Sequence, residues 1–143
     1  MKTYTNFNDY LNETTQLQST QLLTESTGDN NLVTEFFFLA RNCATQSHYL
    51  HLMTGSRSDH IALQLFYDGI VPLIDTFVES FGGKFGLMSK TLPTDIKYLT
   101  ISEFRDWIET NRDKLTDCSE LQNAIDEILT LCNTTQNQLE NLK

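Results

Sequence analysis

The chain has 143 residues, of which 39% are hydrophobic and 20% charged, and its formal net charge is −9. A chain of this length is expected to form one domain and can bury a core without disulfide support. Its ten basic residues form no run, and because neutralising phosphate needs clustered Lys or Arg, the composition argues against nucleic acid and anionic membranes as main partners.

Apolar residues recur at spacings of three and four along most of the sequence, which predicts helices. Residues 4–25 form the weakest segment, because Thr and Asn lower its helix propensity, and a helix or partly helical arm is expected there. Residues 31–54 form a stronger helix that Asp29 or Asn30 can cap and that Gly55 ends.

The next predicted helix covers residues 58–81, with Ser58 as its N-cap. Gly69 and Pro72 lie inside this segment and predict a bend near them. The GGKFG stretch at 82–86 then predicts a flexible turn.

Two more helices are predicted in the last third of the chain. Thr100 and Glu103 form a capping-box pattern at the start of a helix over 101–116. Ser119 and Gln122 repeat that pattern at the start of the last helix, which runs to residue 142.

The predicted fold is therefore all-α: a ferritin-like four-helix bundle over residues 31–143, preceded by an N-terminal arm or helix over 1–30. The connection between the second and third bundle helices, roughly 82–99, is long enough to run from one end of the bundle to the other. A bundle with one such crossover is the ferritin-like arrangement.

Cysteine usage and terminal patterns bear on the compartment. Cys43, Cys118 and Cys132 make an odd count without a CxxC motif, so buried reduced thiols are expected. No apolar run approaches the ~18 residues of a membrane span, and the N-terminal MKTYTNFNDY has no signal-peptide pattern. These features predict a cytoplasmic protein without membrane association.

All three histidines of the chain lie in one stretch, SHYLHLMTGSRSDH, as His48, His51 and His60. Asp75 and Glu79 follow and interrupt the apolar run VPLIDTFVESF. Each of the pairs His48/His51 and Asp75/Glu79 shares one side of its helix. Neutral imidazole and carboxylate together suit iron, zinc and manganese, so these five residues form a candidate metal site.

One subunit cannot gather these five groups around one ion. His60 and Asp75 are 15 residues apart on one helix, which is about 22 Å along its axis. An antiparallel two-fold partner could bring them together. Taken singly, each histidine is also explained as a hydrogen-bonded core residue, and the carboxylates as a solvated stripe.

This arrangement resembles the Dps mini-ferritins. The resemblance rests on His-x-x-His near a helix end, a Gly turn, a His in the next first turn, and Asp-x-x-x-Glu further down. The stretch ALQLFYDGIVPLIDTFVESFGG is also similar to the second helix of that family, which carries Tyr-Asp midway and ends in Gly-Gly. The chain is most similar to small Dps-like proteins of tailed bacteriophages. The resemblance covers residues 33–86, and 100–142 by helix pattern alone.

The resemblance implies a ferroxidase site shared across a two-fold interface, and hence a homo-oligomer that is a dimer or a larger shell. Asp75 and Glu79 match the family's carboxylates, and His60 matches its second histidine. The first histidine is His51 by position in His-x-x-His, or His48 by its twelve-residue spacing to His60. The implied metal is iron, with zinc or manganese as alternatives, and the implied reaction is oxidation of Fe(II) by peroxide or oxygen.

Three departures from the family pattern weaken the expectation of fast iron oxidation. Leu52 stands where the family usually has Trp, Gln64 replaces a common acidic residue, and Ser80 follows Glu79 where Arg is usual. The basic N-terminal tail that many Dps proteins use for DNA is also missing. A site that binds metal without turnover, or a vestigial one, stays open.

The alternative function is a non-enzymatic phage protein on the same bundle, either a virion component or a factor that binds a host protein. Its location would be the host cytoplasm or the virion. A hydrolase or nucleotide-binding role has little support, because the sequence contains no GxSxG, Walker-type or HExxH motif.

Overall fold

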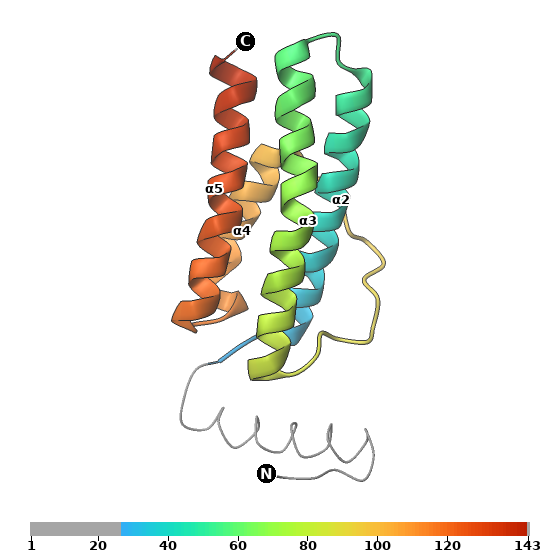
Figure 1. The fold of residues 1–143 in the computed structure, drawn as a ribbon. Helices are drawn as coiled ribbons and strands as arrows, with labels where there is room; N and C mark the ends of the chain where they lie inside the picture. Colours follow the sequence, from blue (N-terminus) through green and yellow to red (C-terminus); the bar gives the residue numbers. More distant parts are fainter. Residues whose placement is uncertain (1–26, 143) are drawn as a thin grey trace, which may run out of the picture.

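The computed structural model describes residues 27–142, and this part of the chain contains four α-helices and no strand. The all-α prediction is therefore confirmed for the described residues. The helices, shown in Figure 1, are α2 (Asn30–Met53), α3 (Arg57–Phe85), α4 (Ile101–Leu115) and α5 (Ser119–Asn141). The arm predicted over 4–25 lies outside the described residues.

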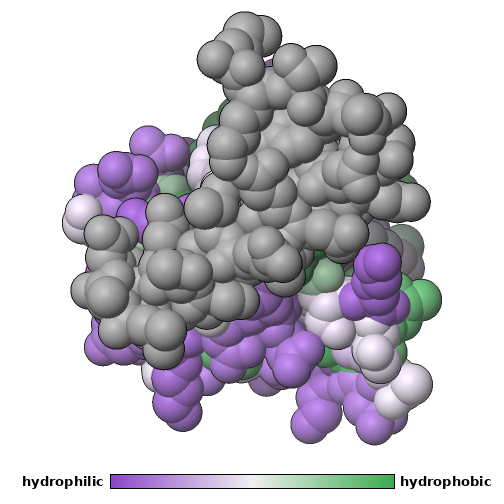
Figure 2. All heavy atoms as spheres, turned by 90° about the horizontal axis from the view of Figure 1, so that it is seen from below, coloured by the Kyte–Doolittle hydropathy of each residue, from purple (hydrophilic) through white to green (hydrophobic). Residues whose placement is uncertain are grey.

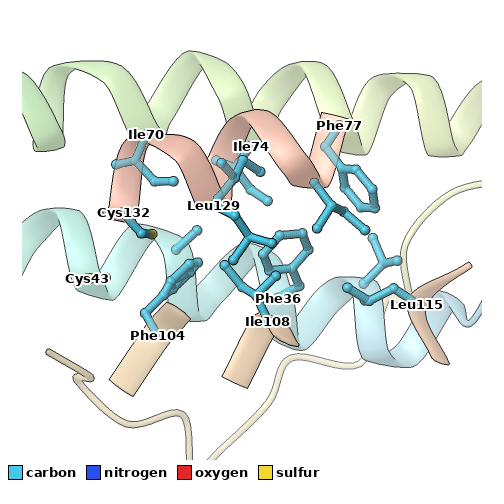
Figure 3. Close-up of a cluster of buried hydrophobic side chains, with 14 of the residues drawn as sticks. Phe36, Cys43, Ile70, Ile74, Phe77, Phe104, Ile108, Leu115, Leu129 and Cys132 are labelled. Carbon is cyan, nitrogen blue, oxygen red and sulfur yellow. The ribbon is translucent and has the colours of Figure 1, made fainter. Parts of the chain in front are cut away.

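The four helices enclose one hydrophobic core. α2 packs against α3 and α4, and α5 packs against the same two helices. The Phe36 ring of α2 meets Phe77 of α3 edge-on at 5.2 Å and stacks on Phe104 and Trp107 of α4 at 6.0 and 5.7 Å between ring centroids. Figure 3 shows Phe36, Phe77 and Phe104 within this cluster, to which all four helices contribute.

Two of the three cysteines belong to the core. Cys43 and Cys132 are buried, and Figure 3 places both in the cluster. Burial raises the pKa of the Cys132 thiol to about 12 and raises the pKa of Cys43 still further. Both side chains therefore stay protonated and act as small apolar groups. Cys118 is also buried, and no described cysteine forms a disulfide.

The predicted N-cap of α2 is confirmed, and the predicted N-cap of α3 is wrong. Asp29 caps α2, because its carboxylate accepts a hydrogen bond from the Leu32 amide at 3.0 Å. α3 is capped by Ser56, whose hydroxyl accepts from the Asp59 amide at 3.3 Å. The prediction of Ser58 is wrong because Ser56 is the residue with extended backbone angles, while Ser58 already lies in the first helical turn.

The predicted end of the same helix is also wrong. α3 continues through Gly82 and Gly83 as far as Phe85 and stops at Gly86, which has a φ of 93°. Phe81 and Phe85 are both buried, so packing of these rings holds the two glycines in helical conformation against their low propensity. Only at Gly86 does the backbone take the positive φ for which glycine is suited.

The middle of α3 lies close to α5. A Cβ atom added to Gly69 would lie 3.1 Å from the Leu131 side chain of α5, so this glycine allows the two helices to approach. Pro72 also lies inside α3, which is one continuous helix from Arg57 to Phe85.

Of the two predicted capping boxes, one forms. Thr100 and Glu103 exchange both expected hydrogen bonds, each at 3.1 Å, at the start of α4. The second prediction is wrong, because Cys118 is the N-cap of α5 and makes no side-chain cap. Gln122 instead donates to the carbonyl oxygens of Arg112 and Thr116, and so ties α5 to the end of α4.

Residues 86–100 connect α3 to α4 without a helix. This linker is held against α2 by hydrogen bonds. The Ser89 amide donates to the Thr34 hydroxyl at 2.9 Å, and the Asn30 side chain donates to the Leu87 carbonyl at 2.8 Å.

The residues that precede α2 are bound to the turn between α4 and α5. The Asp29 amide donates to the Leu115 carbonyl at 3.0 Å, and the Thr116 hydroxyl donates to the Thr27 carbonyl at 2.9 Å. Gly28 forms an isolated antiparallel bridge with Thr116. Residues 27–29, termed the entry strap below, thus connect the start of α2 to the turn between α4 and α5. Seen from this end, the coloured surface in Figure 2 is mostly hydrophilic with small hydrophobic areas.

α3 is the most apolar of the described helices. By length and composition alone it could cross a membrane, with a mean hydropathy of 1.5 over its most apolar window, although core helices of soluble proteins meet the same criteria. Only 33% of that window is buried within the chain.

Candidate functional site

The hairpin between α2 and α3 brings the histidines together. His51 lies in the last turn of α2 and His60 in the first turn of α3. Their rings stack with centroids 3.5 Å apart and planes inclined by 26°. The ring of His48, one turn earlier on α2, lies 6.1 Å from that of His51. His51 is buried, whereas His48 and His60 are exposed.

His51 and His60 also hold each other through the backbone. The Nδ1 atom of His51 lies 2.6 Å from the carbonyl oxygen of His60, and Nδ1 of His60 lies 3.0 Å from the carbonyl oxygen of His51. Because a carbonyl oxygen only accepts hydrogen bonds, both Nδ1 atoms carry the proton. In each neutral ring Nε2 is then the atom with the free lone pair. Metal-binding histidines are commonly anchored in this way, with the other ring nitrogen on a backbone carbonyl.

Tyr67 completes the aromatic cluster. Its ring stacks on His48 at 4.5 Å and meets His51 edge-on at 5.3 Å. A cavity of about 160 Å³ lies beside His48 and Tyr67, with Arg41 and Val71 also in its wall. Sequence reasoning missed Tyr67, although its position seven residues after His60 places both on one side of α3.

The two carboxylates lie elsewhere. Asp75 and Glu79 are exposed on α3, and the helical rise puts Asp75 about 22 Å from His60. Among residues 27–142, no group of three or more His, Cys, Asp or Glu side chains is placed to hold a metal ion. The structure thus brings the histidines together within one chain and leaves Asp75 and Glu79 apart from them. A site completed by a second subunit stays a prediction.

A second polar cluster was not predicted from the sequence. The Lys84 ammonium donates to the Cys118 sulfur at 3.3 Å. Burial acts to raise the pKa of the Cys118 thiol, but the backbone amides of Leu121 and Glu120 and the Lys84 charge outweigh it and lower that pKa. Cys118 is the N-cap of α5, where amide donors and the helix dipole favour a thiolate. Because Lys84 and Cys118 are 34 residues apart, local sequence patterns could not predict this pairing.

Comparison with known proteins identifies the family. The model of DUF5856, a family of unknown function, matches residues 51–139. The chain belongs to the DUF5856 family. The matched region of this DUF5856 protein begins at His51 and includes His60, Asp75 and Glu79, while His48 lies before it. No curated protein and no solved structure matches the chain.

Proposed function

We propose that this DUF5856 protein is a Dps-like, ferritin-fold protein that binds a divalent metal at sites between two subunits. One subunit contributes His48, His51 and His60, and its partner contributes Asp75 and Glu79. The observation that carries the proposal is the His51–His60 pair, in which both Nδ1 atoms are held by backbone carbonyls. That arrangement leaves two adjacent imidazoles with Nε2 as the ligand atom.

The outward side of α3 supports a shared site. Ile61 and Leu65, near His60, are 46% and 54% exposed, and Asp75 and Glu79 follow further along. Antiparallel pairing of two α3 helices would bury these apolar residues and place the histidines of each copy beside the carboxylates of the other. Because a two-fold interface repeats every contact, both sites would form together.

The course of the chain supports the ferritin-like assignment. In Figure 1 the linker after α3 returns from the lower end of the molecule to the start of α4 at mid-height. α3 and α4 therefore run in the same direction, as they do in a four-helix bundle with one long crossover.

The metal class follows from the donor set. Two or three imidazoles with two carboxylates suit iron, and also zinc or manganese. Bound iron would supply one-electron chemistry with peroxide or oxygen, and the chain's own residues would bind and orient it. Leu52, Gln64 and Ser80 stand where Dps proteins usually have a Trp, an acidic residue and an Arg. We therefore propose ferroxidase turnover that is weak or absent.

The test is an anaerobic titration of the full chain with Fe(II), repeated with Zn(II) and Mn(II). His60→Ala and Asp75→Ala should each abolish stoichiometric binding. Asp68→Ala is the matched control, because Asp68 is an exposed carboxylate of α3 that is outside the proposed ligand set. Binding in this control should equal that of the unaltered chain.

Mixing the two inactive variants tests whether the site is shared. A dimer of one His60→Ala and one Asp75→Ala subunit keeps one intact site, so random pairing should restore about a quarter of the binding. Full binding by either single variant would refute the ligand assignment. No recovery on mixing, despite exchange of subunits, would refute the shared site.

A second candidate function is a non-enzymatic phage protein that serves in the virion or binds a host protein. The observation that favours it is the set of exposed apolar side chains at the α2–α3 hairpin, where Tyr49, Leu52 and Met53 are 60–68% exposed. A metal-free protein that is monomeric or dimeric and retains one specific host or virion protein would favour this function. A closed shell of many subunits would favour the ferritin-like function.

A further inference from the structure

α4 is shorter than the helices beside it. It has 15 residues, whereas α2 has 24 and α5 has 23, a difference of about 12 Å in length. In Figure 1, α4 begins near mid-height, while α2, α3 and α5 continue to the upper end. The fourth position around the core is therefore not filled by a helix in the upper part of the described molecule.

Two adjoining cavities occupy that position. Their volumes are about 310 and 330 Å³, and Leu50, Leu63 and Leu139 line both. Ile101, in the first turn of α4, lines the first cavity, and Met53 lines the second. The two cavities together are termed the α4-end groove.

The groove is an exposed apolar surface. Leu50 and Met53 are 43% and 65% exposed, and the buried residues Leu63 and Ile101 also line the groove. Methionine and leucine in an open groove are typical of surfaces that accept the apolar face of a helix.

Acidic side chains lie around the groove, together with one basic side chain, Arg105, which donates to the hydroxyl of the lining residue Ser102. Asp59 is the one charged residue among the described residues that line it. Glu103 and Glu140 directly follow the lining residues Ser102 and Leu139, and both are exposed. An apolar floor with a negative rim is complementary to a cationic amphipathic segment.

We propose that the α4-end groove binds a short cationic amphipathic helix of a partner protein. A helix of about eight residues spans the missing length. Its apolar residues, at spacings of three and four, contact Leu50, Met53 and Leu139, and its Lys or Arg side chains face the acidic rim. This inference is independent of the proposed metal site.

The test measures binding to the full chain by fluorescence anisotropy. The probe is a dye-labelled peptide of roughly 14 residues, built from Leu and Lys with Leu at helical spacing. One control peptide has the same composition with Leu and Lys alternating, and another replaces every Lys by Glu. The helical Leu/Lys peptide should bind one to one, and the two controls should bind at least tenfold more weakly.

Substitutions by serine place the peptide on the groove without changing its charge. Leu50→Ser with Met53→Ser should weaken binding at least tenfold. Leu52→Ser is the matched control, because Leu52 is 68% exposed on the same helix but does not line the groove. Its effect should be less than twofold. Glu140→Gln should weaken binding and reduce its salt dependence. Far-ultraviolet circular dichroism should show equal helix content in all variants.

Several outcomes would overturn the inference. These are equal weakening by Leu52→Ser, equal binding of the alternating or Leu/Glu peptide, and absence of binding. Binding of zwitterionic lipid vesicles that Leu50→Ser with Met53→Ser abolishes would also overturn it, by showing that the surface takes lipid rather than a helix.

Discussion

Gly28→Ala tests how tightly the entry strap fits against the core. A Cβ atom at position 28 would lie 2.7 and 2.8 Å from two ring atoms of Phe81 and 2.8 Å from a ring atom of Phe85. These atoms belong to rigid rings, and Phe81 has no exposed surface. Relief of the contact therefore requires movement of the core or of the strap, with its hydrogen bonds to Thr116 and Leu115.

Movement of the core and movement of the strap both lower the free energy of unfolding. Overpacking of a well-packed core typically costs about 1–3 kcal/mol, and each strap hydrogen bond that weakens costs about 1 kcal/mol. We expect Gly28→Ala to lower the free energy of unfolding by about 2–3 kcal/mol. Gly83→Ala is the matched control, because its added Cβ meets no atom within 4 Å and position 83 lies inside α3. It should raise stability by about 0.8–1 kcal/mol, the propensity difference between glycine and alanine in a helix.

Urea denaturation followed by circular dichroism measures both changes through the midpoint and the slope. The two alanine variants should shift the midpoint in opposite directions at an unchanged slope. A Gly28→Ala protein that unfolds at the same or higher urea concentration than the unaltered chain would refute the reasoning. Equal shifts of the same sign in both variants would also refute it.

Three other predictions concern the cysteine cluster, a cap and the core. The Cys118 thiolate contributes stability fully above the unfolded pKa of 9.0 and loses it as pH falls through the lower folded pKa. Lys84→Met should therefore cost more stability at pH 9 than at pH 6 in urea denaturation, and equal losses would contradict this. Ser56→Ala should cost about 1 kcal/mol and Ser58→Ala clearly less in thermal unfolding, and a reversed order would restore Ser58 as the cap. Phe36→Ala should cost about 3–5 kcal/mol in the same measurement, and a loss below 1 kcal/mol would contradict its place in the aromatic cluster.

Helix positions were the most predictable part of the fold, because amphipathic spacing reports which residues face a core. The start of α4 shows this best, since Thr100 and Glu103 act on neighbours in sequence and form the predicted box. The end of α3 was not predictable from local patterns. Two glycines lower helix propensity there, and the burial of Phe81 and Phe85 that overrides it comes from tertiary packing.

In the candidate site, too, spacing along one helix was predictable from the sequence and tertiary contacts were not. Helical spacing predicted that His48 and His51 share a side, and the structure places their rings 6.1 Å apart. The stacking of His51 on His60 depends on the path of the three-residue hairpin loop, which spacing along a helix does not describe. The proposed role of Asp75 and Glu79 requires a second copy, because the two carboxylates lie apart from the histidines within one chain.

The entry strap has a practical consequence for dissecting the protein. The family match begins at residue 51, and the helical pattern begins at residue 31, so either position would be a natural place to cut a recombinant fragment. A fragment from residue 51 would lack most of α2 and leave the core surfaces of α3 and α4 without Val33, Phe36 and Ala40. A fragment from residue 31 would lose the backbone partners of Leu115 and Thr116. A fragment that keeps the hydrogen bonds of the entry strap must therefore include Thr27.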